Sequence, residues 1–148
     1  MGKSILVLTG SSRRGGNSDK MADAFIAGAV EAGHAAVKFE ATSAEIKGCR
    51  ACGACFSKGR PCVFEDDFNE GLAPLLEKAD ALVFATPLYW FSFPAQLKAA
   101  MDKLYAFLVG KRPLKIRECA LLVCGVAHDL REYEGIVRSY ETIAEYER

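Results

Sequence analysis

Four cysteines gather within fourteen residues of the chain: Cys49, Cys52, Cys55 and Cys62. Gaps of two, two and six residues separate them. Closely spaced thiolates in a loop can hold a cubane iron–sulfur cluster. Four thiolates can also bind zinc, although zinc sites usually have two separated pairs of ligands. Free or redox-active thiols are the third interpretation, and the spacing alone leaves all three open.

A polar loop follows the first apolar run of the sequence, Ile5 to Leu8, and a helical pattern begins after it at Asp19. The loop has neither the Lys-Ser/Thr ending of a P-loop nor the glycine spacing of a dinucleotide-binding loop. Its hydroxyl, amide and guanidinium groups suit a phosphate monoester bound without Mg²⁺ at a helix N-terminus. They come from Ser11, Ser12, Arg13, Arg14, Asn17 and Ser18. A solvated glycine-rich turn with a capping serine is the alternative.

Aromatic residues crowd the segment that follows a later apolar run, Ala81 to Ala85. Four of them fall within five residues: Tyr89, Trp90, Phe91 and Phe93. Exposed aromatic rings in a loop are costly unless a flat ligand or a partner subunit covers them. The segment therefore indicates either a wall for a planar ring system or packing on the sheet or on an interface.

An alternation of strands and helices must position these three segments. Apolar runs predict strands at residues 5–8, 36–40, 81–85 and 119–124, and the second alternates with charges, as an edge strand does. Helices are expected from Asp19, from Asp66 or Asp67, from Pro94 through Leu108, and from Ile136. The alternation implies an α/β fold, a doubly wound parallel sheet with right-handed crossovers, in a single domain over residues 1–148.

The ligand site of such a sheet lies beyond the carboxyl ends of its strands, near the point where the strand order reverses. We therefore expect the loops after the first, third and fourth strands to meet there. The polar loop, the aromatic loop and the turn that starts at Gly125 would then surround one ligand.

Two of these segments give the chain a family likeness: it resembles the NADPH-dependent FMN reductases of the flavodoxin-like proteins. GSSRRGGNS, residues 10–18, is similar to the FMN phosphate loop of that family, and PLYWFSFPAQLKAAMDK, residues 87–103, to its isoalloxazine loop and the following helix. The resemblance implies that the phosphate is held by Ser11, Arg13, Asn17 and Ser18. It also implies that the flavin ring is lined by Pro87, Leu88, Tyr89, Trp90 and Phe91, with Gly125 in a third wall.

The cysteine spacing resembles that of the iron–sulfur flavoproteins, relatives of the same reductases, and so implies a 4Fe–4S cluster. The family's sheet has five strands in the order 2-1-3-4-5, whereas this sequence ends at Arg148, within the helix before the fifth. We therefore expect the order 2-1-3-4 without the usual fifth strand. Either the chain is truncated or another subunit covers the open edge, so a homo-oligomer is expected.

Charge and composition limit the classes of binding partner that we expect. Nineteen basic and nineteen acidic residues give a net charge of zero without a long Lys/Arg block, which argues against nucleic acid. No apolar stretch reaches the roughly 18 residues of a membrane span, and no signal peptide is recognised. Neither membrane insertion nor secretion is expected, and six cysteines then predict thiols in a reducing cytoplasm.

The expected function is that of an FMN-dependent oxidoreductase with NAD(P)H as co-substrate. Hydride would pass from the nicotinamide to the flavin and then to a small-molecule electron acceptor, such as a quinone, a free flavin, or a nitro or azo compound. No side chain need act as an acid or a base, so no catalytic residue is assigned. The alternatives are an iron–sulfur electron carrier without nicotinamide activity and a flavin-free interaction module.

Overall fold

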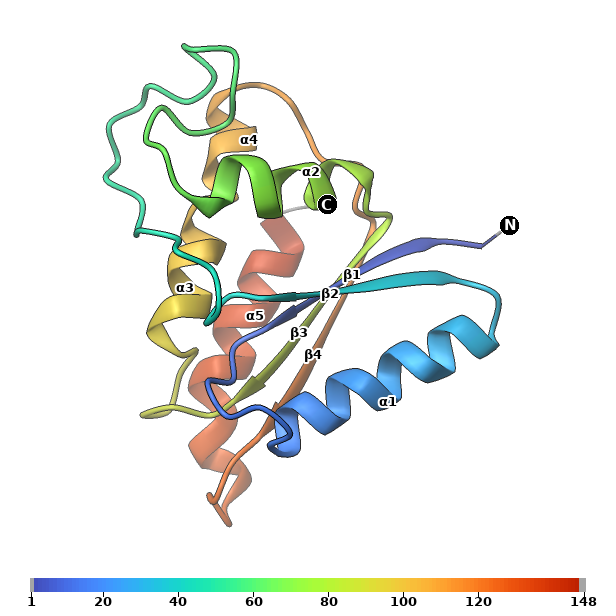
Figure 1. Ribbon diagram of the computed structural model, residues 1–148. Helices are drawn as coiled ribbons and strands as arrows, with labels where there is room; N and C mark the ends of the chain where they lie inside the picture. The colour runs from blue at the N-terminus through green and yellow to red at the C-terminus, as the bar shows by residue number, and fades with distance from the viewer. Residues whose placement is uncertain (1, 147–148) are drawn as a thin grey trace.

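A computed structural model describes residues 2–146 and places a parallel β-sheet at the centre of the molecule (Figure 1). The strands are β1 (Ser4–Thr9), β2 (Ala35–Glu40), β3 (Ala81–Pro87) and β4 (Glu118–Cys124). They pair in the order β2-β1-β3-β4, and every pair of neighbours is parallel. The predicted α/β fold and the strand order 2-1-3-4 are confirmed.

The central strands β1 and β3 are buried almost throughout because their sequences are continuously apolar. β2 alternates between apolar and charged residues and lies at one edge, as predicted. β4 lies at the other edge of the sheet that the described residues form, and its apolar side chains are only half-buried.

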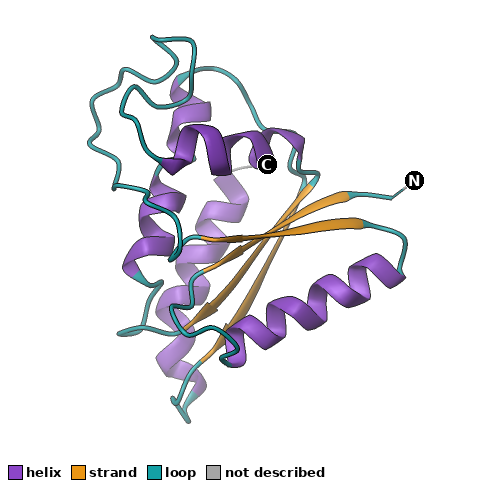
Figure 2. Ribbon diagram, in the orientation of Figure 1, coloured by secondary structure: helices purple, strands orange, loops and turns teal. Residues whose placement is uncertain are grey.

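Helices lie on both sides of the sheet (Figure 2). α1 (Asn17–Glu31) packs on one face, against residues of β1 and β3 such as Val7 and Val83. The other side carries α2 (Ala73–Lys78), α3 (Ala95–Asp102), α4 (Tyr105–Val109) and α5 (Glu134–Tyr146), together with the larger core. No helix between residues 2 and 146 combines the length and the apolar composition that crossing a membrane requires.

Helix α1 begins at Asn17, two residues before the start expected at Asp19. Asp19 faces the preceding loop, where its Oδ2 accepts a hydrogen bond of 2.8 Å from the Gly15 amide. The helix therefore starts directly at the end of the polar loop, and its positive N-terminal end lies beside that loop.

The helix expected to continue to Leu108 is interrupted, so the second half of this prediction was wrong. α3 ends at Asp102 and α4 starts at Tyr105. Between them the chain forms a tight turn, in which the Lys103 amide donates to the Ala100 carbonyl at 3.2 Å. Lys103 is buried at this turn, whereas Leu108 is 50% exposed.

A one-turn π-helix, Phe68–Leu72, precedes α2. Asp66 Oδ1 accepts a hydrogen bond of 3.0 Å from the Phe68 amide at its start. Asp66 therefore satisfies a backbone donor at the start of this helical segment, as expected. Asp67 is the residue directly before Phe68, the first residue of the π-helix.

Candidate functional site

The loops after β1, β3 and β4 meet beyond the carboxyl ends of these strands, as expected for the fold. They surround a cavity of about 380 Å³, which we call the strand-end cavity. Eight of the ten residues predicted for the flavin line it: Ser11, Arg13, Asn17, Ser18, Pro87, Leu88, Tyr89 and Gly125. The polar loop and the aromatic loop therefore face the same space.

The other two predicted residues, Trp90 and Phe91, lie next to the strand-end cavity instead of in its wall. They line an adjoining cavity of about 270 Å³. Leu88 and Val126 line both cavities, so the two spaces are neighbours. The predicted ring-binding residues thus continue outward from the strand ends.

The polar end of the strand-end cavity is a preformed turn. Ser11 Oγ accepts a hydrogen bond of 3.1 Å from the Arg13 amide, and the Gly16 amide donates to the Arg13 carbonyl at 3.1 Å. Gly15 has a φ of 69°, a left-handed conformation that favours glycine. Ser18 lies buried in the first turn of α1. Hydroxyls, an arginine and a helix N-terminus at one end of a cavity suit a phosphate group.

The aromatic end is a tight hairpin turn. Tyr89 and Ser92 exchange two backbone hydrogen bonds, of 3.0 and 2.9 Å. The two residues between them, Trp90 and Phe91, have φ angles of 45° and 64°, a conformation that costs non-glycine residues of order 1–3 kcal/mol each. Trp90 is 92% exposed, so the turn holds a large ring out in solvent beside the cavity.

A hydrogen bond of 2.7 Å from the Leu88 amide to the Cys124 carbonyl joins the aromatic loop to the end of β4, where the third wall of the cavity begins. A Cβ on Gly125 would lie 3.1 Å from Leu88 Cβ, so glycine keeps the two walls close. Cys124, the last residue of β4, also lines the cavity. Burial raises the pKa of its thiol, and a hydrogen bond with Ser18 acts in the opposite direction.

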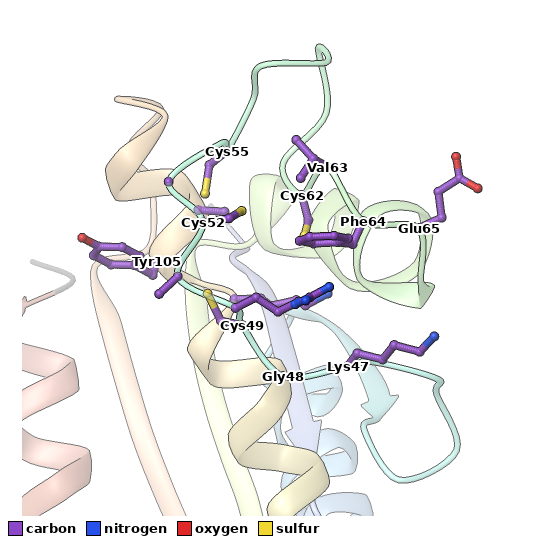
Figure 3. A pocket seen from close by; sticks show the side chains of 15 residues that line it. Lys47, Gly48, Cys49, Cys52, Cys55, Cys62, Val63, Phe64, Glu65 and Tyr105 are labelled. Carbon is purple, nitrogen blue, oxygen red and sulfur yellow. The ribbon is translucent and has the colours of Figure 1, made fainter.

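The four clustered cysteines line a separate cavity of about 210 Å³, the cysteine cavity, beside the start of α4 (Figure 3). Cys49, Cys52 and Cys55 come from one arm of the loop and Cys62 from the other. All four are free thiols. Burial raises the pKa of the Cys55 thiol, and the neighbouring cysteines raise it further. The structure therefore brings the predicted ligand set together.

The four cysteines line the wall of a cavity, and their side chains do not converge on a single ion site. Among residues 2–146, no three His, Cys, Asp or Glu side chains are placed to hold a single metal ion. Zinc would require sulfurs at about 2.3 Å from one centre.

Hydrogen bonds and ring packing hold the loop that carries the cysteines. Asn69, in the π-helix, bonds both backbone groups of Cys62. Phe56 packs on Phe107 of α4 with 5.8 Å between ring centroids. A Cβ on Gly110 would lie 2.1 Å from the Phe56 ring, so glycine is required where the loop meets the end of α4.

Positive side chains outnumber negative ones around the cysteine cavity. Lys47, Arg50 and Lys103 line it, whereas Glu65 is the acidic residue in its wall. This charge balance suits an anionic group, which a cluster held by four thiolates would be.

The cysteine cavity and the strand-end cavity share no lining residue. Helix α3 connects their surroundings, because it begins just after the Tyr89–Ser92 hairpin and ends at Asp102, directly before Lys103 in the wall of the cysteine cavity. Eight residues of helix span about 12 Å. The two sites are thus distinct places in one chain.

A doubly wound parallel sheet with a phosphate-type loop after its first strand and an aromatic loop after its third defines a flavodoxin-like domain. The chain belongs to the NADPH-dependent FMN reductase family, whose sequence profile matches residues 4–133. The resemblance seen in the sequence motifs is thereby confirmed.

Iron–sulfur flavoproteins are among the curated relatives of the chain. It is 37% identical over 106 residues to the iron-sulfur flavoprotein of Archaeoglobus fulgidus, a match that covers 72% of this chain and 46% of that protein. The chain spans about half the length of the first curated relatives that it matches.

Solved structures of more distant sequence share the fold. RosB with the bound intermediate 8-demethyl-8-formylriboflavin-5'-phosphate superposes with a TM-score of 0.74 at 17% identity, over 97% of this chain and 59% of RosB. The NAD(P)H:quinone oxidoreductase of Methanothermobacter marburgensis superposes with a TM-score of 0.63 at 17% identity, over 100% of this chain and 98% of that one. At this level of sequence identity, the two matches show a shared fold only.

Proposed function

We propose that the chain binds FMN in the strand-end cavity and acts as an NAD(P)H-dependent flavin oxidoreductase. The observation that carries the proposal is that phosphate-type donors and an aromatic hairpin, about 75 residues apart in sequence, line one cavity at the strand ends. Membership of the FMN reductase family supports it.

Each wall of the cavity has its own task in this proposal. Ser11, Arg13, Asn17 and Ser18 hold the phosphate, and the amides at the start of α1 add their partial charge. Pro87 to Phe91 flank the ring, and Gly125 lets the backbone approach it closely. Bound FMN supplies the chemistry, accepting hydride from NAD(P)H and passing electrons to a small-molecule acceptor such as a quinone, a free flavin, or a nitro or azo compound. The chain binds, orients and shields it, and no side chain is assigned as an acid or base.

We propose further that Cys49, Cys52, Cys55 and Cys62 hold a 4Fe–4S cluster. A cubane is wider than a single ion, so its ligands surround a space, as these thiols do. The width of this space, with no three of these side chains placed around a single ion in residues 2–146, and the names of the curated relatives favour a cluster over zinc. A protein with both groups could also serve as an iron–sulfur electron carrier that a ferredoxin-type donor reduces faster than NADPH does.

An ultraviolet–visible spectrum with flavin and iron assays tests both proposals on the protein purified without oxygen. FMN binding predicts a flavin spectrum with about one equivalent of FMN. The cluster predicts additional broad absorbance in the visible blue and about four iron atoms per chain. Colourless protein that takes up no added FMN contradicts the first proposal and favours an interaction module. Flavin-bound protein that takes up no iron after reconstitution contradicts the second.

We propose that the protein works as a homo-oligomer in a reducing cytoplasm. Trp90, Val126 and Leu130 are large apolar residues that stand exposed, and the first two line the cavity beside the proposed flavin. A second copy that covers them would bury apolar surface and shield the ring. Four cysteines that bind a cluster as thiolates would need a reducing compartment.

A further inference from the structure

A buried ion pair joins Lys103 to Asp66 at the base of the cysteine loop, which we define as residues 47–66. The side chains of Lys103 and Asp66 are 3% and 1% exposed. Lys103 lines the cysteine cavity and Asp66 does not. Lys103 therefore lies in the wall of the cavity and Asp66 outside it, and the Lys103 ammonium also lies 5.5 Å from the centre of the Phe68 ring.

Asp66 also closes the base of the cysteine loop. Its Oδ2 accepts a hydrogen bond of 3.1 Å from the Lys47 amide, and its Oδ1 accepts one of 3.0 Å from the Phe68 amide. Lys47 lies two residues before the first cysteine of the set and Asp66 four residues after the last. Lys103 follows the last residue of α3, so the ion pair fastens both ends of the loop to the end of this helix.

The other charged residues in the wall of the cysteine cavity are placed differently. Lys47 and Glu65 direct their charged groups away from the four sulfurs (Figure 3). The Arg50 guanidinium lies 5.0 Å from the centre of the Phe64 ring. Lys103 is the buried cation of the wall, and a buried charge acts more strongly on its neighbours than one screened by water.

We propose that Lys103 and Asp66 form a positioning pair that sets the reduction potential of the 4Fe–4S cluster as well as the shape of its loop. This inference rests on the cluster proposed above. Four thiolates outweigh the positive charge of an oxidised cubane core, so the group is anionic, and reduction by one electron adds negative charge. An adjacent ammonium stabilises the reduced state, and the carboxylate paired with it weakens that effect.

The two partners therefore act on the potential in opposite directions. Lys103→Met removes the cation and leaves a buried carboxylate, which disfavours the reduced cluster. Asp66→Asn leaves the ammonium uncompensated, which favours it. The double variant removes both charges and returns the potential toward that of the wild type. A purely structural pair predicts instead that both single variants shift the potential in the same direction or leave it unchanged.

The test is a redox titration with dithionite of the full chain, reconstituted with iron and sulfide without oxygen, read by the cluster's electron paramagnetic resonance signal. We expect the equilibrium constant for one-electron reduction to fall at least tenfold in Lys103→Met, about 59 mV. It should rise at least tenfold in Asp66→Asn and lie within about threefold of wild type in the double variant. Lys103→Arg keeps the charge and should keep the wild-type potential.

The exposed pair Lys98–Asp102 on the same helix, at 45% exposure for each side chain, is the matched control. Lys98→Met and Asp102→Asn should leave the cluster potential unchanged, and no variant should shift the FMN potential. If the wild type binds a cluster but both single variants shift its potential in the same direction, or neither shifts it, the role of the pair is overturned and the cluster proposal stands. Wild-type protein that binds no iron overturns the cluster and this role together. If Lys103→Met does not fold, the other two variants decide the question: Asp66→Asn should favour the reduced cluster at least tenfold, and Lys103→Arg should keep the wild-type potential.

Discussion

Asn69 hydrogen-bonds both backbone groups of Cys62: its Oδ1 accepts from the Cys62 amide at 2.8 Å, and its Nδ2 donates to the Cys62 carbonyl at 3.0 Å. The same Nδ2 also donates to the Phe64 carbonyl at 3.0 Å. Six residues separate Cys62 from Cys55, the nearest of the other three cysteines. The π-helix therefore helps to fix the position of the fourth thiol.

Asn69→Ala should loosen the fourth cysteine. It removes three hydrogen bonds and leaves backbone groups unsatisfied, at a cost of about 1–3 kcal/mol. We expect reconstituted protein to lose iron several-fold faster to a chelator while keeping its FMN. Ser57→Ala is the control, because Ser57 bonds only the Ala54 carbonyl at the loop tip. Equal iron loss from both variants would contradict this role for Asn69.

Arg13 should contribute directly to FMN affinity. It lines the strand-end cavity, whereas the neighbouring Arg14 lines a small polar cavity on the other side of the loop. A hydrogen bond to a charged group is worth about 1.5–3 kcal/mol, so Arg13→Met should raise the Kd for FMN roughly 10- to 100-fold. Fluorescence titration measures this, with Arg14→Met as the control of equal charge. Similar losses in both variants would show general electrostatics instead of a contact.

Gly10 should be needed where β1 passes into the polar loop. A Cβ there would lie 2.7 Å from Thr86 Oγ1 and 2.8 Å from Leu97 Cδ2. Gly10→Ala should therefore lower the free energy of unfolding by about 1–3 kcal/mol in a urea titration. Gly28→Ala, in the last turn of α1, where an added Cβ would meet no atom within 4 Å, should instead raise it by about 0.5–1 kcal/mol. A stable Gly10→Ala variant would mean that the contact is not as close as the structure has it.

The strand order and the strand-end cavity could be predicted from the sequence. Val7 and Val83 lie in uninterrupted apolar runs, which is the pattern of central parallel strands. Once the strands are parallel, the fold rule determines which loops meet, so Ser18 and Tyr89 could be assigned to one site although 70 residues separate them.

The supports of the cysteine loop could not be predicted. Lys103 continues a helical pattern in the sequence, and periodicity carries no information about a partner 37 residues away. Asp66 was assigned to a helix start, which accounts for one of its oxygens and not for the other.

Asp19 should make stability depend on acid pH. Hydrogen bonds from Lys38 and from the Gly15 amide lower the pKa of its carboxyl group. A lowered pKa adds stability above the unfolded value of about 3.9, and this contribution is lost as the pH falls through the folded value. The free energy of unfolding should therefore fall between about pH 5 and pH 2 less steeply in Asp19→Asn than in the wild type. Equal slopes for the variant and the wild type would contradict this.

The proposed homo-oligomer should be visible by light scattering at micromolar concentration. Trp90→Ser removes the ring that is 92% exposed and should weaken the assembly without unfolding the chain. Lys20→Ser, on the exposed surface of α1, is a control that should leave the mass unchanged. A folded, flavin-bound wild type that scatters as a monomer would contradict the proposal.

The most direct test of FMN binding is a crystal structure of the protein grown with excess FMN. We expect the phosphate within hydrogen-bonding distance of Ser11, Arg13 and Ser18, and the ring against the Tyr89 hairpin. Density for FMN elsewhere, or a strand-end cavity filled by protein side chains with FMN absent, would contradict the account.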